Sequence, residues 1–224
     1  MATIVQQVYA EQASGSASQT ITLSQALSTG STVVVLTGFG RTGGTPAISS
    51  VVNNGTANTY LQAVGAAASQ TTANPRMHTD IWFCDNVNAG ATIVTVTFNT
   101  ISATTSFIGV VEFLSTMAPS IVEAGGRVGT TTPATGGSVT IVGGELMMSC
   151  IIVASGSVSS VDSPWSALSG AITFMVATYD GAAAGTYAPT YTLSGNVRWA
   201  SSSAEADFTS NVPGASNILL KKVT

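Results

Sequence analysis

The residues Ile93–Phe98 alternate between two faces, and this alternation constrains the fold more than any other feature of the chain. The two valines and Phe98 lie on one side, while isoleucine and the threonines lie on the other. A period of two with β-branched residues is typical of a half-buried β-strand. The short apolar run Ile81–Cys84 precedes it, separated by a turn cluster of Asn and Gly at 86–90. We therefore predict two adjacent strands of a β-sandwich within Asp80–Phe98.

The rest of the chain repeats this pattern of short apolar runs separated by polar turns. Residues 53–55, Asn-Asn-Gly, carry a strong hairpin signal and predict that the chain returns along Tyr60–Val64 after the strand Ile48–Val52. Gly65–Arg76 has no apolar period and is predicted to be a surface loop, and Ala2–Ala10 is predicted to be a first strand or an arm. Further strands are expected at Thr20–Leu23, Thr32–Thr37, Phe107–Phe113, Leu146–Val153, Val158–Val161, Ala171–Tyr179, Tyr187–Leu193, Val197–Phe208 and Asn217–Val223.

Met117–Gly137 is rich in Gly, Thr and Pro and is predicted to join two halves, because the order of strand signals begins again after it. Leu146–Val153 in the second half corresponds to Thr32–Thr37 in the first, and Val158–Val161 corresponds to Ile48–Val52. The later strands correspond in the same order. The chain therefore carries a weak internal duplication.

Four strands in the first half correspond to four strands in the second. This pattern predicts an all-β fold, an antiparallel two-sheet β-sandwich in the form of a jelly roll of about eight strands. Two small tandem sandwiches are the alternative. We expect one domain that neither half can form alone, since each half has too few strands to cover its apolar faces. The boundaries are 1–224 for the domain, about 20–116 and 138–208 for the halves, 117–137 for the join, and 1–19 and 209–224 for terminal arms. Residues expected in the core are Val34, Val94, Val96, Phe98, Val111, Ile151, Phe174 and Val176.

Charged side chains are scarce, at 7% of 224 residues, and hydrophobic residues make up 45%. An ordinary globular protein carries about 25% charged residues. The six Lys and Arg residues form no basic stripe and the net charge is −4, which argues against nucleic-acid binding. No signal peptide and no membrane span is recognisable, so we expect assembly in a cytoplasm and no membrane partner. A surface with so few charges suits a protein that is packed against neighbours.

The sequence offers few groups for catalysis. His78 is its one histidine, and a Ser–His–Asp triad would need Asp80 or Asp85 to orient it. No G-x-S-x-G motif supplies a nucleophile, so we interpret His78 as a loop or strand-edge residue. A glycosidase would need two carboxylates across a cleft, and none of the acidic residues lies in a paired motif. We predict that the protein is not an enzyme.

Metal and cofactor sites are not predicted either. Two distant cysteines and one histidine lack zinc-ligand spacing. Asp80, Asp85, Asn86 and Asn88 could offer oxygen ligands to calcium, but no D-x-D-x-D-G run is present and Asn-rich turns are common for backbone reasons. Cys84 and Cys150 lie among apolar neighbours, which favours two buried, reduced thiols over a disulfide.

The three tryptophans are candidates for an aromatic surface that stacks on a sugar. Trp82 lies in an apolar run and is expected in the core, whereas Trp165 follows Ser-Pro in a loop and is the best candidate for an exposed contact. Trp199, next to Arg198, is expected on a sheet face or in an interface. Exposed aromatic residues on a surface with few charges mark a protein interface more often than a ligand site.

Six short motifs follow one another along the chain: Ile48-Ser49-Ser50-Val51, Asn58-Thr59-Tyr60, Ile81-Trp82-Phe83-Cys84, Ala89-Gly90, Val94–Phe98 and Val111-Glu112-Phe113. In this order they resemble a recurrent β-sandwich module of phage virion proteins and bacterial surface proteins. The family pattern is roughly VxSVxDxxGNxY, then WY, then AGxxTVTVTF, then ExxG. This chain departs from it with Asn53-Asn54 in place of an Asp and with no Gly directly after Phe113. The resemblance implies a non-catalytic, surface-displayed jelly roll.

We therefore expect a virion structural protein, such as a phage head decoration or cement subunit or another capsid- or tail-associated subunit. Its partners would be its own copies, in a trimer or a lattice, and a virion shell protein. A carbohydrate-binding or adhesin module is the alternative. Contacts are expected from Ala2–Glu11, Asn217–Thr224 and Gly65–Arg76. The candidate interface residues are Trp165, Trp199, Arg198, Tyr9, Leu219 and Leu220.

Overall fold

The computed structural model describes residues 3–13, 15–55, 57–102, 105–114, 120–142, 145–171 and 173–207. The described structure contains no helix and is 60% strand, so the predicted all-β class is confirmed. The strands of the first half are β1 (Thr3–Gln12), β2 (Ser18–Thr22), β3 (Thr32–Arg41), β4 (Ile48–Asn53), β5 (Leu61–Gln62), β6 (Ala68–Gln70), β7 (Arg76–Cys84), β8 (Ile93–Phe98) and β9 (Ser106–Leu114). Those of the second half are β10 (Ser120–Gly129), β11 (Ala134–Thr135), β12 (Val139–Ile141), β13 (Glu145–Val153), β14 (Val158–Val161), β15 (Ser166–Ala171), β16 (Phe174–Ala182), β17 (Gly185–Tyr187), β18 (Thr190–Leu193) and β19 (Trp199–Asp207).

The first half forms two antiparallel sheets of its own. The larger sheet has the strand order β1-β9-β3-β7-β5, with β6 also paired to β7, and the smaller has the order β2-β8-β4. Strand β3 is the centre of the larger sheet, because it is hydrogen-bonded to β7 on one side and β9 on the other. Its residues Val33–Leu36 are buried on both faces, as suits a strand with an unbroken apolar run.

The second half repeats the same order of strands. Its larger sheet runs β10-β19-β13-β16-β15, and two smaller sheets have the orders β11-β18-β14 and β12-β17. In the order of strands across the large sheets, β3 and β13 both stand third and β9 and β19 both stand second. No described sheet combines strands from both halves. The duplication seen in the sequence therefore appears as two halves with matching topology.

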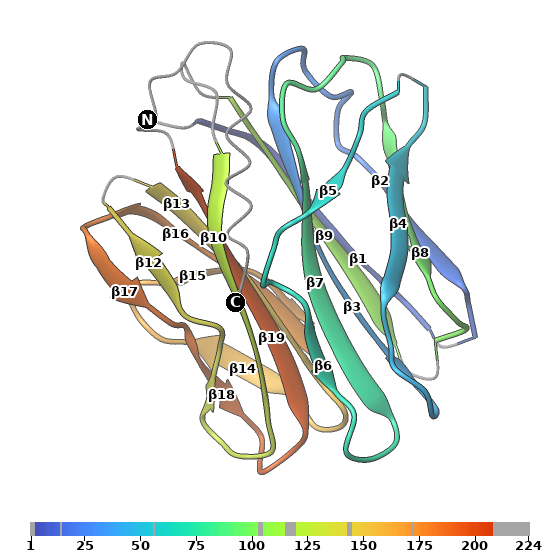
Figure 1. Ribbon diagram of the computed structural model, residues 1–224, viewed down its shortest axis with the longest axis vertical. Coiled ribbons are helices and arrows are strands. Elements are labelled where there is room, and N and C mark those ends of the chain that lie inside the picture. The colour runs from blue at the N-terminus through green and yellow to red at the C-terminus, as the bar shows by residue number, and fades with distance from the viewer. Residues whose placement is uncertain are drawn as a thin grey trace, which may run out of the picture.

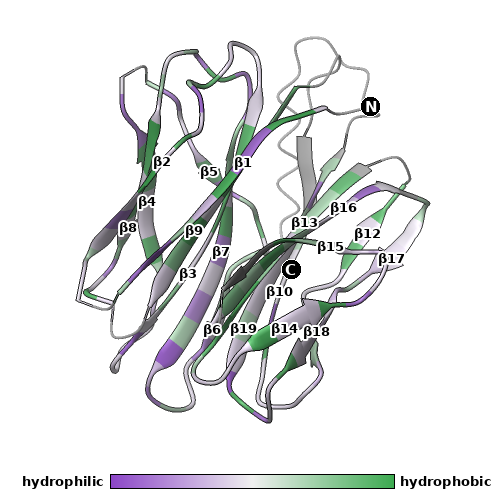
Figure 2. Ribbon diagram, turned by 180° about the vertical axis from the view of Figure 1, so that it is seen from behind, coloured by the Kyte–Doolittle hydropathy of each residue, from purple (hydrophilic) through white to green (hydrophobic). Residues whose placement is uncertain are grey.

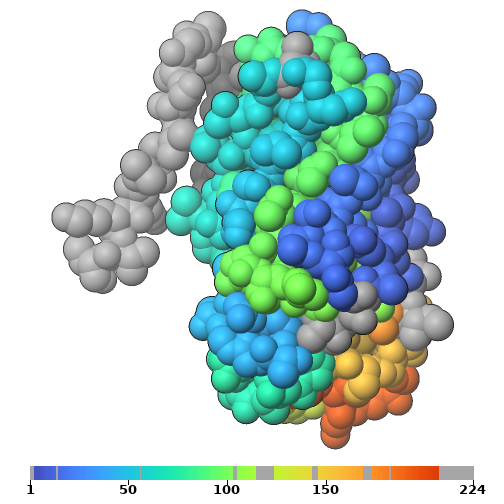
Figure 3. All heavy atoms as spheres, turned by 90° about the vertical axis from the view of Figure 1, so that its right-hand side faces the viewer, coloured from blue at the N-terminus to red at the C-terminus, as the bar shows by residue number. Residues whose placement is uncertain are grey.

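Four layers result, as Figure 1 shows: the small sheet of the first half, the two large sheets, and the small sheets of the second half. The outer face of the first half fills most of the view in Figure 3. Between the two large sheets lies one apolar layer, here called the inter-half core. Figure 2 shows hydrophobic residues on the strands of both large sheets. The inter-half core includes Val34, Leu36, Ile81, Phe107, Val111 and Phe113 from the first half, and Met148, Cys150, Ile152, Phe174, Val176 and Ala204 from the second.

One side of the contact between the halves is closed by backbone packed on backbone. The oxygens of Ala66 and Ala67 lie so near Gly126 on β10 that a Cβ there would stand 2.8 and 2.7 Å from them. Buried Ser202 of β19 donates to the oxygen of Ala66 at 2.6 Å and shares a 2.7 Å hydrogen bond with Thr79 of β7. Gly126 therefore allows β10 to approach the segment that leads into β6, and the two hydroxyls link β19 to that segment and to β7.

Several strand predictions are confirmed at the level of burial. Val94, Val96 and Phe98 are buried while the alternate residues of β8 are not, and the other predicted core residues are buried too. The two-sheet jelly roll of about eight strands is not confirmed, because the described strands are distributed over five sheets. The predicted final strand at Asn217–Val223 lies outside the described residues.

Two local predictions are wrong. The Asn-Asn-Gly turn does not make a hairpin, since β4 pairs with β8 and β5 pairs with β7 in the other sheet. Instead Asn54 Oδ1 accepts hydrogen bonds from the backbone N–H groups of Thr92 and Ile93, both at 2.8 Å. Gly65–Arg76 is not a surface loop, because it contains β6 and buries small residues against the second half. The segment 117–137, predicted to join the two halves, contains the strand β10, whose glycines lie where backbones pack closely.

Candidate functional site

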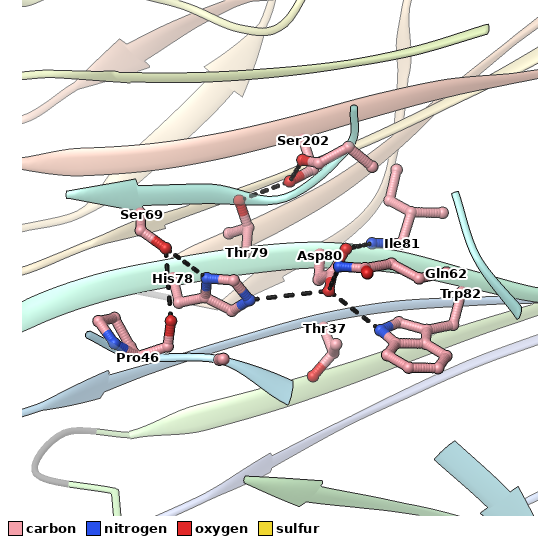
Figure 4. Close-up of polar contacts among 12 residues, drawn as sticks. Thr37, Pro46, Gln62, Ser69, His78, Thr79, Asp80, Ile81, Trp82 and Ser202 are labelled. Carbon is pink, nitrogen blue, oxygen red and sulfur yellow. Dashed lines mark hydrogen bonds and ion pairs between the residues drawn. The ribbon is translucent and has the colours of Figure 1, made fainter. Parts of the chain in front are cut away.

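The structure brings His78 together with a serine and an aspartate, as Figure 4 shows. His78 and Asp80 follow each other on the same face of β7, and Ser69 lies on the neighbouring strand β6 at the register position of His78. Ser69 Oγ and His78 Nδ1 are 2.8 Å apart, and His78 Nε2 is 3.7 Å from Asp80 Oδ2. The prediction of a loop or strand-edge histidine is wrong, because His78 is 3% exposed and its strand is paired on both sides.

Asp80 is already satisfied by other donors. Its Oδ1 accepts from the Ile81 N–H at 2.9 Å, and its Oδ2 accepts from Gln62 Nε2 at 2.6 Å and Trp82 Nε1 at 3.1 Å. At 3.7 Å the histidine contact is too long for a hydrogen bond. A catalytic triad needs the aspartate bonded to the histidine and room for a substrate beside the serine. The arrangement therefore acts as a buried polar network that holds β5, β6 and β7 together.

A second buried carboxylate fixes strand β1. Glu112 on β9 is fully buried and accepts from Gln6 Nε2 at 2.5 Å and from the Ser28 N–H at 2.7 Å. Gln6 in turn accepts from Ser24 Oγ at 2.9 Å and donates to the backbone oxygen of Gln25 at 3.1 Å. A buried carboxylate is tolerated when donors surround it in this way. The network therefore links β1 to β9 and to the turn before β3.

The interface residues proposed from the sequence fall into different environments. Trp165 is 7% exposed and packs against Tyr179, so its predicted exposure is wrong; the turn after Pro164 folds the indole inward against β12 and β16. Trp199 is 2% exposed and donates from Nε1 to the oxygen of Thr131 at 3.0 Å. Tyr9 is 54% exposed. Leu219 and Leu220 lie outside the described residues.

The two cysteines belong to different layers. Cys84 faces the core between the two sheets of the first half, whereas Cys150 lies in the inter-half core. Both are unpaired in the structure, and burial raises the pKa of each thiol, that of Cys84 to about 11. The geometry is therefore that of two inert core thiols, as the apolar neighbours predict.

The two carboxylates that were considered as calcium ligands have hydrogen-bond donors of their own. The donors that surround Asp80 occupy its carboxylate, while Asp85 accepts from Thr32 Oγ1 at 3.2 Å. Within the described ranges, no group of three or more His, Cys, Asp and Glu side chains is placed to hold a metal ion. No described helix is long and apolar enough to cross a membrane.

Strand β1 ends the larger sheet of the first half, and its side away from β9 is here called the free edge; the Gln19 side chain covers part of it, since Nε2 donates to the Ala10 oxygen at 2.9 Å. Among the described strands β1 is hydrogen-bonded only to β9, over ten residues that include one charge, Glu11. Tyr9 reaches over the second half and meets Phe174 edge-on at a centroid distance of 6.3 Å. Beneath it lies a cavity of about 90 Å³, lined by Gln7, Tyr9, Gly109, Leu168 and Val176 among others. Pockets for small ligands usually measure about 300–1,000 Å³, so this cavity suits a packing gap.

The two sides of the contact between the halves therefore differ. On one side β6 and β10 meet through glycine and buried hydroxyls, while on the other side β1 and β15 leave a cavity and an exposed tyrosine. No protein-family model, no curated protein and no solved structure matches the chain. The β1 edge, with Tyr9 at its centre, is the candidate functional surface.

Proposed function

We propose that the protein is a non-catalytic structural subunit that assembles through the free edge of β1. The observation that carries the proposal is an edge strand of ten residues with a single charge and an exposed tyrosine. Such an edge presents a row of unpaired backbone groups to another chain, and proteins that remain monomeric usually blunt it with charges, proline or a cover. Among the described residues the edge carries one charge, Glu11, and one side-chain cover, Gln19, whose Nε2 donates to the Ala10 oxygen at 2.9 Å.

The setting that we propose is a virion, with a shell protein and further copies of the chain as partners. The sequence motifs that resemble phage virion modules support this setting, as does a surface with few charges. We further propose that each half is a jelly-roll-type sandwich, because the orders β1-β9-β3-β7 and β2-β8-β4 match two interleaved Greek keys with one strand short. A head decoration or cement subunit is the form that we favour.

The buried tryptophans give the sugar-binding alternative no support. Trp165 and Trp199 are buried, and the Trp82 indole is hydrogen-bonded to Asp80. The Ser69–His78 contact likewise gives an enzymatic role no support, since the aspartate beside it is bonded elsewhere.

Sedimentation velocity of the full chain at low micromolar concentration tests the assembly. The wild type should sediment as a homo-oligomer, with little change between low and high salt, because apolar burial and neutral hydrogen bonds would hold it. Tyr9→Lys should shift it toward the monomer, since a lysine on an edge strand opposes pairing. Val64→Lys, which alters a residue that is 71% exposed and off this edge, is the matched control. A wild-type protein that sediments as a monomer and also binds no virion particle would refute the proposal.

The virion setting has its own measurement. Particles from the source culture are banded in a density gradient, and their proteins are identified by mass spectrometry. We expect the chain in the particle band at a fixed ratio to the major shell protein. Its absence from every particle band, with the chain recovered only in free fractions, would refute the setting and leave the assembly claim to the sedimentation result.

A further inference from the structure

Three of the six cationic residues of the chain gather at one end of the molecule. Arg41 ends β3 and Arg76 begins β7, and the two are direct partners in the antiparallel register. Arg198 directly precedes β19. The loops that lead from β3 to β4, from β6 to β7 and from β18 to β19 all lie at the lower end of Figure 1. Like charges placed directly opposite each other on paired strands repel and destabilise the pair, unless a group of opposite charge or a hydrogen-bond acceptor lies beside them.

Arg41 and Arg76 both lie against Gly44. Arg76 Nη1 donates to the Gly44 oxygen, and a Cβ on Gly44 would stand 2.7 Å from Arg41 Nη2. Arg41 Nη1 also donates to the Thr45 oxygen at 3.0 Å. Gly44 has a φ of +60°, a conformation that favours glycine. The glycine turn therefore brings the two guanidinium groups close together.

Arg198 joins them through Asn74. Its Nη2 donates to the Asn74 oxygen at 2.5 Å, and Asn74 Oδ1 accepts from the Gly43 N–H at 2.9 Å. The residue after Asn74 is Pro75, and Arg76 follows. Asn74 thus ties the loop beside Arg76 both to the glycine turn and to the second half of the chain.

The charge of this cluster is not neutralised by the described residues. Their described hydrogen bonds reach neutral oxygens only, and the three guanidinium groups make no ion pair with a described carboxylate. Arg41 Nε, Arg76 Nε and Arg198 Nη1 are shielded from water and have no hydrogen-bond partner. Protein atoms cover these three nitrogens, so an anion would instead contact the outer guanidinium nitrogens, such as Arg41 Nη2 and Arg76 Nη2, and would balance the positive charge.

We propose that Arg41, Arg76 and Arg198 form a binding site for a compact multivalent oxyanion, namely phosphate or sulfate. Guanidinium groups present paired N–H donors that match the oxygens of such ions. Three positive charges exceed what one carboxylate would balance, which favours an ion with two negative charges. The inference does not depend on the proposed assembly through β1, because the cluster and the Tyr9 surface involve different residues.

Inorganic phosphate is the first probe, added to the full chain at constant ionic strength. We expect saturable binding in calorimetry with a dissociation constant on the order of 1 mM, since the three arginines are partly exposed to water, and a rise in Tm with phosphate concentration. Arg76→Gln and Arg41→Gln should each weaken binding roughly tenfold or more, because each removes charge-assisted hydrogen bonds. Acetate at the same ionic strength should have little effect.

Arg127→Gln is the matched control, because Arg127 is exposed on β10 and outside the cluster. It should bind phosphate like the wild type. Should Arg76→Gln fail to fold, Arg198→Gln provides the same test through a different strand. No saturable phosphate or sulfate binding by the wild type, or an equal loss in the Arg127 variant, would overturn the proposal.

The phosphate could be free or borne by a lipid, and a second arm separates these sources. Vesicles of phosphatidylcholine with and without phosphatidic acid are sedimented with the protein. Binding to free phosphate without binding to the phosphatidic acid vesicles assigns the site to soluble phosphate groups. Vesicle binding that Arg41→Gln abolishes and Arg127→Gln retains assigns it to a lipid headgroup.

Discussion

Replacing Phe107 and Phe174 by leucine, singly and together, tests whether the halves pack as the structure shows. The rings belong to β9 of the first half and β16 of the second, and they stack at a centroid distance of 4.4 Å with 5° between their planes. Both are fully buried. Each single change should lower the free energy of unfolding by about 1–2 kcal/mol through lost burial and ring contact. An aromatic pair contributes about 0.5–1.5 kcal/mol beyond burial, so the double variant should lose that much less than the sum of the singles.

Urea unfolding followed by far-UV circular dichroism and tryptophan fluorescence measures the four proteins of this cycle. The pair Phe39 and Phe98 is the positive control, because it stacks at 4.5 Å entirely within the first half. Phe39 with Phe174 is the negative control, since the two rings lie in different cores and their effects should add within about 0.5 kcal/mol. A coupling near zero for Phe107 and Phe174, with normal coupling in the positive control, would refute packing between the halves.

Three further changes probe local features. Gly126→Ala should destabilise the fold by about 1–3 kcal/mol in urea unfolding, because its Cβ would press on backbone oxygens, whereas Gly195→Ala, with nothing within 4 Å, should change it by less than about 0.5 kcal/mol. Burial raises the pKa of Asp85 to about 6, so the folded state should lose stability as pH rises from 4 to 7, and Asp85→Asn should remove that loss. A flat wild-type profile would contradict this. Cys84 and Cys150 should resist maleimide at pH 7 until urea unfolds the chain, and rapid labelling of either thiol in the native protein would show that its core opens.

Alternation and β-branched residues were sufficient to predict strands in which the pattern of apolar residues follows the buried faces. The run Thr32–Thr37 and the alternating Ile93–Phe98 became β3 and β8 because one or both faces are covered by apolar layers. The repeated order of signals also indicated two halves with the same topology. Whether the halves share one sandwich or form their own sheets depends on long-range pairing, which the local pattern does not specify.

Small residues were the main source of wrong predictions. Gly125 and Gly126 lie in the segment that was predicted only as a join, with no strand in it, although glycine is needed in β10 because backbones approach within the reach of a Cβ. Ala66 and Ala68 gave no apolar period, yet both are buried against the second half. A run of small residues has the same composition in a flexible connection and in a close backbone contact, so the sequence alone did not separate the two.

Some residues of the candidate surfaces could be named from the sequence, whereas others could not. Ser69 carries no motif, and it meets His78 only because β6 pairs with β7 in one register. Arg41, Arg76 and Arg198 are far apart in the sequence and converge through two loops. Tyr9 could be named because it lies in a first strand with few charges, whereas the inward turn of Trp165 depends on packing against β12 and β16.

Separating the halves should leave neither soluble, even though each has its own sheets. Released from its partner, the fragment Met1–Thr116 would expose one whole face of its large sheet, including Leu36, Ile81 and Phe107, which are now fully buried. Apolar patches of that extent drive aggregation. The two halves meet through equivalent sheets, as the subunits of a two-fold dimer do, so the separated fragment should also tend to pair with itself. A dispersed NMR spectrum from monomeric Met1–Thr116 would refute this and would show that the chain is two independent domains.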